Sequence, residues 1–184
     1  MAIAARLRYA DLESIPEEHP GDRHELINGE LIVTPVPIMK HQIVSGNIIF
    51  LLDTFARDRG AGRVLPAPTG IRLTPDNLLI PDVLFVAADR LHVIGPKTVD
   101  AAPDLVVEIL SPGTRQRDLT VKRALYARFG VREYWIVDPE ARTIQLLTLA
   151  GDVFAPVKPD EDGVLRSQVL PDLIVDGETV FAGV

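Results

Sequence analysis

Two acidic residues stand in segments whose other residues are almost all apolar. Asp82 lies within Leu78–Val86 and Glu108 lies within Leu105–Leu110. Burying a carboxylate in such a strand is unfavourable by several kcal/mol unless a cation or hydrogen bonds compensate. Two such carboxylates could share one cation, and their hard oxygen atoms suit Mg²⁺ or Mn²⁺. Alternatively, each lies at a strand end, in water or capping a turn, and Pro81 favours this for Asp82. The residues alone leave both interpretations open.

A lysine follows on the next predicted helix, which the spacing places at Asp118–Phe129. Three polar side chains recur there every four residues: Asp118, Lys122 and Tyr126. The neighbouring stripe is apolar and is predicted to face the core: Val121, Leu125 and Phe129. The short loop Ser111–Arg117 allows Lys122 to fold back toward Glu108, where an ammonium could position a water nucleophile or stabilise charge on a phosphate. The alternative is an ordinary surface pair of Asp118 with Lys122.

Basic residues gather around the same helix. From Gly113 to Arg132 there are six basic residues and one acidic residue, although the whole chain has a net charge of −7. This pattern indicates either an electrostatic footprint for a phosphate backbone or the solvated face of one helix. The candidate backbone contacts are Arg115, Arg117 and Arg123.

Several other kinds of site are not supported. The four histidines are scattered, which argues against a histidine metal centre, and His41 at the start of a predicted long helix has the best claim to a place in a site. The chain has no glycine-rich dinucleotide or phosphate loop, no Gly-x-Ser-x-Gly elbow and no His-Glu-x-x-His motif.

Hairpins, helices and apolar strands must position these residues. Asn28-Gly29 predicts a two-residue turn in a hairpin over His24–Pro35, and Pro37–Arg59 is the clearest helix. A short helix is possible at Ala10–Glu18. Further strands are predicted at Arg63–Leu73, Leu78–Ala87, Asp104–Leu110, Tyr134–Val137, Thr143–Thr148, Asp152–Val157 and Val164–Ile174. This order predicts a mixed α/β fold with helices on both sides of a sheet.

Length and composition fit a single soluble domain spanning residues 1–184. The chain has 47% hydrophobic and 24% charged residues, which is ordinary for globular proteins. Its longest apolar run, Val83–Ala88, is far too short for a membrane span, and Met1–Arg8 lacks the apolar core of a signal peptide. The absence of cysteine excludes disulfides and thiolate sites and fits a cytoplasmic protein. The negative net charge argues against binding nucleic acid through bulk charge.

Taken in order, the motifs extend over nearly the whole chain, from about residue 9 to 181. They are Glu25–Leu31, His41, Ile80-Pro81-Asp82-Val83, Pro103–Pro112 around Glu108, Asp118 with Lys122, and Gly130–Pro139. This ordered set resembles a bacterial endonuclease family of the PD-(D/E)xK, restriction-endonuclease-like superfamily, a family long catalogued as a domain of unknown function. The resemblance implies a central mixed β-sheet flanked by helices, with extra β-hairpins, and DNA as the substrate.

The resemblance also implies roles for particular residues. Asp82 and Glu108 would hold Mg²⁺ or Mn²⁺, with the carbonyl of Ile109 as a further ligand. Glu25 matches the family's N-terminal acidic position and would reach the metal through water. Together with Lys122, these acidic residues form the expected catalytic set.

One residue departs from the superfamily pattern. In Glu-x-Lys the lysine would stand at position 110, where this chain has Leu110. The matching lysine would then have migrated to the helix as Lys122. We expect its amine to lie within about 4–6 Å of the carboxylates of Asp82 and Glu108. The accessory candidates are His41, Asp118 and Tyr126.

Two hypotheses of different kinds follow. The first is a metal-dependent endonuclease that hydrolyses DNA phosphodiester bonds, favoured by the intact Asp82, Glu108 and Lys122. The second is a catalytically degenerate module of the same fold that serves DNA binding or oligomeric assembly, favoured by the net acidity and by Leu110. We also expect a homo-oligomer, because Thr143–Ile174 carries a surplus of apolar residues.

Overall fold

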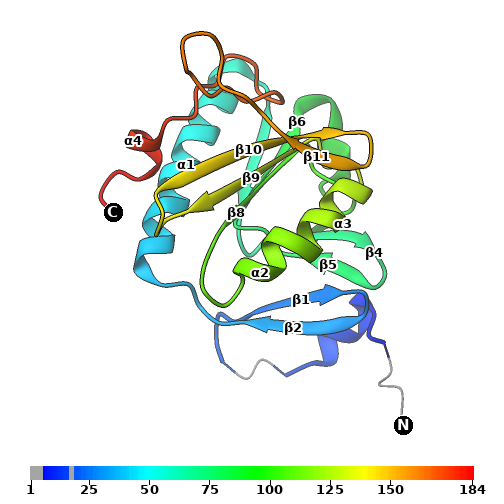
Figure 1. The fold of residues 1–184 in the computed structure, drawn as a ribbon. Helices are drawn as coiled ribbons and strands as arrows, with labels where there is room; N and C mark the ends of the chain where they lie inside the picture. The colour runs from blue at the N-terminus through cyan, green and yellow to red at the C-terminus, as the bar shows by residue number, and fades with distance from the viewer. Residues whose placement is uncertain (1–5, 17–18) are drawn as a thin grey trace.

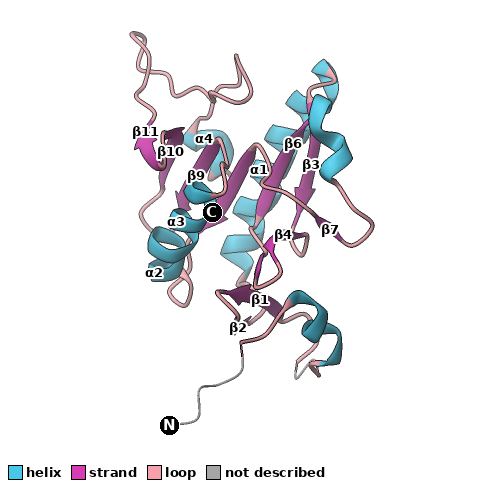
Figure 2. Cartoon of the chain, turned by 90° about the vertical axis from the view of Figure 1, so that its right-hand side faces the viewer, coloured by secondary structure: helices cyan, strands magenta, loops and turns pink. Residues whose placement is uncertain are grey.

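The computed structural model describes residues 6–16 and 19–184, and in it the strands form two mixed sheets. The five-stranded sheet has the order β2-β1-β5-β4-β7, and the six-stranded sheet has the order β11-β10-β9-β8-β6-β3. The β1–β2 hairpin lies at one end of the molecule, beyond the end of the six-stranded sheet (Figures 1 and 2). Helices flank the strands, so the mixed α/β fold class is confirmed.

The five-stranded sheet contains β1 (Arg23–Ile27), β2 (Glu30–Thr34), β4 (Gly70–Thr74), β5 (Asn77–Leu79) and β7 (Thr98–Val99). The six-stranded sheet contains β3 (Gly62–Pro66), β6 (Val83–Ala87), β8 (Leu105–Ile109), β9 (Glu133–Asp138), β10 (Thr143–Ala150) and β11 (Val153–Pro156). The α-helices are α1 (Met39–Arg59), α2 (Arg115–Arg117), α3 (Arg123–Arg128) and α4 (Gly177–Val180). A π-helical turn, η3 (Asp118–Lys122), joins α2 to α3, and η1 (Tyr9–Ser14) and η2 (Ala88–Val93) are 3₁₀ helices.

Two of the local sequence signals form the structures they predict. Asn28 and Gly29 have φ of 53° and 78°, the positive values that the two-residue turn between β1 and β2 requires. The helix α1 ends at Gly60, whose φ of 59° lies in the left-handed region. No helix in the described ranges is long and apolar enough to cross a membrane.

The six-stranded sheet has an apolar core on each face. The helix α1 belongs to one core through Val44, Ile48, Leu52 and Ala56. The helix α3 belongs to the other core through Leu125, Tyr126 and Ala127. Side chains alternate along β8, so that Val106 and Leu110 join the core of α3 while Val107 and Ile109 join the core of α1. Glu108 therefore points toward the α3 side.

The connection between two parallel strands brings a helix to the face that Glu108 occupies. The strands β8 and β9 are parallel, so the chain must cross over between them, and it does so through α2, η3 and α3. The strand β6 pairs antiparallel with β8, with Val83 opposite Val107. This register places Asp82, one residue before β6, beside Glu108.

Two predicted strands are each divided in the structure, because proline lacks the N–H that continues a ladder. The segment Leu78–Ala87 is wrong as one strand: β5 and β6 belong to different sheets, and the chain passes between them at Ile80–Asp82. The segment Arg63–Leu73 likewise becomes β3 and β4, which also lie in different sheets. Asp82 thus stands at the junction of the two sheets rather than inside a strand.

Two further predictions need correction. The segment Val164–Ile174 is not a strand, and its pairing is a single bridge between Arg166 and Ile174. Its conformation is fixed instead by the buried carboxylate of Glu133, which accepts hydrogen bonds from the amides of Gln168 and Val169. The helix predicted at Ala10–Glu18 is the shorter 3₁₀ helix η1, and residues 17–18 of that prediction lie outside the described ranges. Residues 1–5, part of the Met1–Arg8 segment without a signal-peptide core, also lie outside them.

The pairing of β3 with β6 supports the junction at Asp82 and depends on a glycine. A Cβ at Gly62 would lie 2.1 Å from the carbonyl oxygen of Val86 on β6. We therefore expect Gly62→Ala to lower the free energy of unfolding by about 1–3 kcal/mol or more. The control is Gly46→Ala, at an exposed position of α1 with nothing within 4 Å, which should raise it by about 0.5–1 kcal/mol. Urea unfolding measures both, and an equal effect of the two changes would contradict the expectation.

Candidate active site

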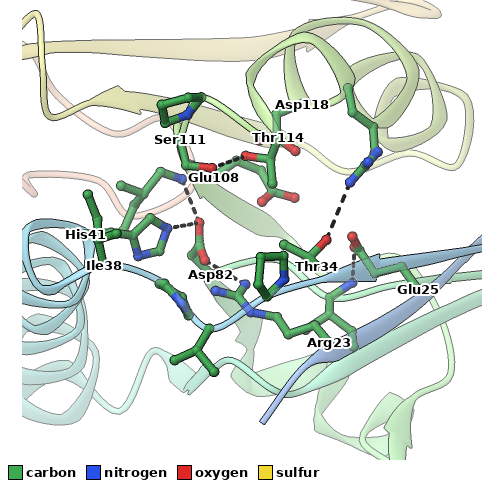
Figure 3. A pocket seen from close by; sticks show the side chains of 18 of the residues that line it. Arg23, Glu25, Thr34, Ile38, His41, Asp82, Glu108, Ser111, Thr114 and Asp118 are labelled. Carbon is green, nitrogen blue, oxygen red and sulfur yellow. Dashed lines mark hydrogen bonds and ion pairs between the residues drawn. The ribbon is translucent and has the colours of Figure 1, made fainter. Parts of the chain in front are cut away.

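A pocket of about 260 Å³ opens where the two sheets meet (Figure 3). Its walls come from β1, the β2–α1 connection, the β5–β6 junction, and the end of β8 with the helical segment that follows. Most of the residues that the sequence singled out line it: Glu25, His41, Asp82, Glu108, Ile109, Arg117, Asp118 and Lys122. Motif residues that are far apart in the sequence are therefore close together in space.

Asp82 is held by three donors on one side of the pocket. Nη1 of Arg23 donates to Oδ1 at 2.8 Å, and the backbone N–H of Ile109 donates to Oδ2 at 2.7 Å. Nε2 of His41 lies 3.2 Å from the same Oδ2 (Figure 3). Burial alone would raise the pKa of Asp82, but His41, Arg23 and the Ile109 amide together hold it below its ordinary value. Asp82 is therefore an ionised, oriented carboxylate.

Lys122 is the centre of a second group. Its Nζ lies 2.8 Å from Oε1 of Glu25, 2.9 Å from Oε1 of Glu108 and 3.6 Å from Oδ1 of Asp118. The hydroxyl of Tyr126 donates to the same Oε1 of Glu108 at 2.7 Å. All five side chains are buried. The expected approach of Lys122 to Glu108 is thus found, although position 110 holds leucine.

One ammonium is shared by three carboxylates, and this sets the protonation states. Burial raises the pKa of Glu108 well above its ordinary value and raises that of Asp118, while Lys122 opposes both shifts. Burial alone would lower the pKa of Lys122, but Glu108, Glu25 and Asp118 raise it above its ordinary value overall. Lys122 is therefore an ammonium at neutral pH, and the three carboxyl groups around it outnumber this one cation.

Two buried polar atoms at the pocket have no hydrogen-bond partner within the described residues. They are Nδ1 of His41 and Oδ1 of Asp118. A buried polar atom without a partner is unfavourable by about 1–3 kcal/mol, and such atoms in native structures often mark a ligand, ion or water. The Oδ1 atom of Asp118 is an acceptor whose ion pair with Lys122 is long, at 3.6 Å, so a closer cation or a hydrogen-bond donor would satisfy it.

These donors fit a hard divalent cation in their chemistry. Carboxylate oxygens are the ligands that such a cation prefers, and four carboxylates line this one pocket: Glu25, Asp82, Glu108 and Asp118. These acidic groups outnumber the cationic side chains that contact them, and Oδ1 of Asp118 accepts no hydrogen bond. No three histidine, aspartate or glutamate side chains close into a metal cage in the described part of the chain. The carboxylates are instead turned onto Arg23 and Lys122. Both oxygens of Asp82 accept bonds from the protein, and Oε1 of Glu108 accepts from Lys122 and Tyr126.

The three arginines predicted to contact a backbone have different surroundings. Arg115 forms an ion pair with Asp138 at 2.5 Å, and Arg123 donates to the carbonyl of Phe154 at 3.1 Å. Neither is among the residues that line the pocket, whereas Arg117 is. Of the three, Arg117 is the one placed to meet a ligand in the pocket.

Two residues at the site differ from what the sequence predicts. Val121 is 41% exposed rather than buried, because the π-helical turn η3 has more residues per turn than the 3.6 spacing assumes. Arg23, the direct partner of Asp82, was missed. Its signal was its position two residues before Glu25, since alternate residues of a strand share a face.

Comparisons with known proteins agree with this picture. Residues 8–177 match the model of the Uma2 family, described as "Putative restriction endonuclease". The fold is similar to a crystal structure described as a "putative nuclease belonging to DUF820" from Anabaena variabilis ATCC 29413, with a TM-score of 0.74 and 19% sequence identity. The alignment covers 95% of this chain and 97% of that one. No curated protein matches the chain.

The shared ammonium leads to a stability prediction. Replacing Lys122 by methionine leaves buried carboxylates without a counter-charge, which we expect to lower the free energy of unfolding by roughly 3–5 kcal/mol at pH 8. The loss should be smaller at pH 5. Glu108 and Asp118 already have raised pKa values, and without the ammonium they bind protons still more readily than the unfolded chain does.

Urea unfolding at the two pH values measures this effect. The control is Lys97→Met, because Lys97 is 70% exposed and pairs with Glu13 on the surface, so its loss should leave the free energy of unfolding nearly unchanged. A Lys122→Met variant as stable as this control would contradict the shared-ammonium account.

Proposed function

The chain belongs to the Uma2 family of restriction-endonuclease-type proteins, and on this basis we propose that it is a metal-dependent endonuclease that hydrolyses DNA phosphodiester bonds. The observation that carries the proposal is the position of Lys122. Its ammonium lies 2.9 Å from Glu108 although the lysine place of the superfamily motif holds Leu110. We take this ammonium, which comes from the following helical segment, as the charge that the motif requires.

Asp82 and Glu108 would hold Mg²⁺ or Mn²⁺, with the carbonyl of Ile109 proposed as a further ligand on the strength of the family resemblance. A bound cation of this kind lowers the pKa of a coordinated water and offsets charge on a phosphate. Glu25 and Asp118 complete the acidic wall, and Asp118 contributes the unsatisfied oxygen.

Lys122 acts in this proposal as a fixed positive charge. Because its pKa is raised, it remains protonated at neutral pH and does not serve as a base. Its N–H groups can orient a water or stabilise negative charge that develops on the phosphate. Tyr126, whose pKa is also raised, stays neutral and donates to Glu108, so it holds the carboxylate in position.

Binding of DNA would depend on local charge, since the chain as a whole has a net charge of −7. Arg117 lines the pocket, and Nη1 lies 3.5 Å from the hydroxyl of Thr34, a contact that a phosphate could replace. We assign Arg117 to the DNA backbone, and Arg115 and Arg123 to contacts outside the pocket. His41 orients Asp82.

One observation favours the second candidate, a catalytically degenerate module that binds DNA or assembles into oligomers. Both oxygens of Asp82 already accept bonds from the protein, through Arg23 on one and the Ile109 amide on the other. A site in which these bonds are permanent would bind no metal. Titration with Mn²⁺ separates the candidates, because the module should give no binding heat.

Neutral variants of the two proposed ligands test the enzyme directly. Asp82→Asn and Glu108→Gln should each lower Mg²⁺-dependent cleavage of plasmid DNA by about a hundredfold or more, since each replaces a carboxylate oxygen that would bind the cation with a neutral amide. The control is Asp53→Asn, which removes a surface carboxylate paired with Arg57 and should leave cleavage unchanged. Circular dichroism confirms that each variant is folded. Cleavage retained by both ligand variants would contradict the assignment.

Self-association is a separate part of the proposal. Most apolar residues of Thr143–Ile174 are buried or half-buried in the structure, and its exposed large apolar residues are Val153 and Ile174. The remaining argument is that paired nucleases cut both strands, which is an analogy. We expect sedimentation at micromolar concentration to give a mass above the 20.2 kDa of one chain. A single 20.2 kDa species would exclude the oligomer.

A further inference from the structure

Arg23 forms a direct ion pair with a proposed metal ligand, and this pair suggests a way in which metal and substrate binding are linked. We propose that Arg23 is a positioning residue that covers Oδ1 of Asp82 in the absence of metal and transfers to a substrate phosphate when metal binds. The inference rests on the proposed function. In this proposal Arg23 competes with the cation for Oδ1 of Asp82, and it binds the phosphodiester once the cation has taken that place.

The two oxygens of Asp82 are held differently. Oδ2 receives the Ile109 amide at 2.7 Å and lies 3.2 Å from Nε2 of His41, both on elements of the six-stranded sheet or its covering helix. Oδ1 receives Nη1 of Arg23 at 2.8 Å. The backbone and His41 therefore fix the orientation of the carboxylate, while Arg23 covers the other oxygen. Removing Arg23 would expose Oδ1 without releasing the carboxylate.

The surroundings of Arg23 allow it to exchange partners. It lies on β1, two residues before Glu25, and it lines the pocket. A guanidinium has five N–H donors, and within the described residues the side chain that Arg23 contacts is Asp82. Its fork of donors also matches a phosphate, which accepts two parallel hydrogen bonds from arginine. A phosphate in the pocket could thus replace the carboxylate as its partner.

Lys122 is not suited to this exchange. It contacts three carboxylates and its side chain is 4% exposed, whereas the Arg23 side chain is 13% exposed and contacts one carboxylate. Two cations cannot share Oδ1 of Asp82 at close range without strong repulsion. A divalent cation that binds Asp82 therefore displaces Arg23, and a phosphate that attracts Arg23 favours the cation. By linkage, each ligand strengthens the binding of the other by the same factor.

Calorimetric titration with Mn²⁺ alone, in the absence of DNA, tests the competition. Arg23→Gln should bind Mn²⁺ about tenfold more tightly than the parent chain, because one charge-assisted hydrogen bond no longer has to be broken. The control is Arg117→Gln, which removes an equal charge from the same pocket but no ion pair to a carboxylate, as Arg117 contacts Thr34. It should change the affinity by less than about threefold.

The second measurement tests the transfer to phosphate. Fluorescence anisotropy follows binding of a labelled duplex oligonucleotide with phosphorothioate linkages, which resist hydrolysis. Mn²⁺ should tighten binding to the parent chain by a larger factor than to Arg23→Gln, because only the parent can transfer Arg23 to the phosphate. The control Arg57→Gln, which breaks a surface pair with Asp53 outside the pocket, should behave as the parent does. Parent and Arg23→Gln chains that bind Mn²⁺ equally, or a weaker Arg23→Gln, would overturn the inference and leave the proposed function standing. No Mn²⁺ binding by the parent chain would overturn both.

Discussion

The ammonium of Lys122 is the interaction on which the arrangement of this site depends. It joins Glu25 from the five-stranded sheet, Glu108 from the six-stranded sheet and Asp118 from its own helical segment. Without it, these buried carboxylates would repel one another and could ionise only at a large cost in stability. The two sheets therefore meet around one positive charge. The pocket lies at this meeting point, where acidic residues from both sheets surround the ammonium.

The charge balance of the site links structure to function. The ammonium of Lys122 contacts three carboxyl groups, and the guanidinium of Arg23 contacts Asp82. Three of the four acidic groups therefore share one cation. Burial, together with the carboxylates of Asp118, Asp82 and Glu25, raises the pKa of Glu108 even though Lys122 opposes the shift. Oδ1 of Asp118 accepts no hydrogen bond and has only a long ion pair with Lys122. A divalent cation would supply further positive charge. The same acidic pocket would repel a phosphate in the absence of metal, so cation and phosphate are expected to bind together.

Much of this site could be predicted from the sequence because its signals are local. The alternation of side chains along a strand placed Glu108 on one face, and the short connection to the next helix brought Lys122 back to it. The pairing of Asp82 with Arg23 could not be predicted, because it joins residues 59 positions apart across two sheets. The exposure of Val121 was also missed, since hydrophobic spacing gives no sign of a π-helical turn. Local periodicity thus identified the elements, whereas the division of Leu78–Ala87 between two sheets required tertiary structure.

We propose that Asp82 and Glu108 together hold a divalent cation in this pocket. Crystals soaked in Mn²⁺ test it most directly, because the anomalous signal of manganese locates the ion independently of any assay for cleavage. We expect one strong peak about 2–2.5 Å from carboxylate oxygens of both Asp82 and Glu108, with Arg23 withdrawn from Oδ1 of Asp82. A pocket without manganese at saturating Mn²⁺, with the Arg23–Asp82 ion pair intact, would contradict it.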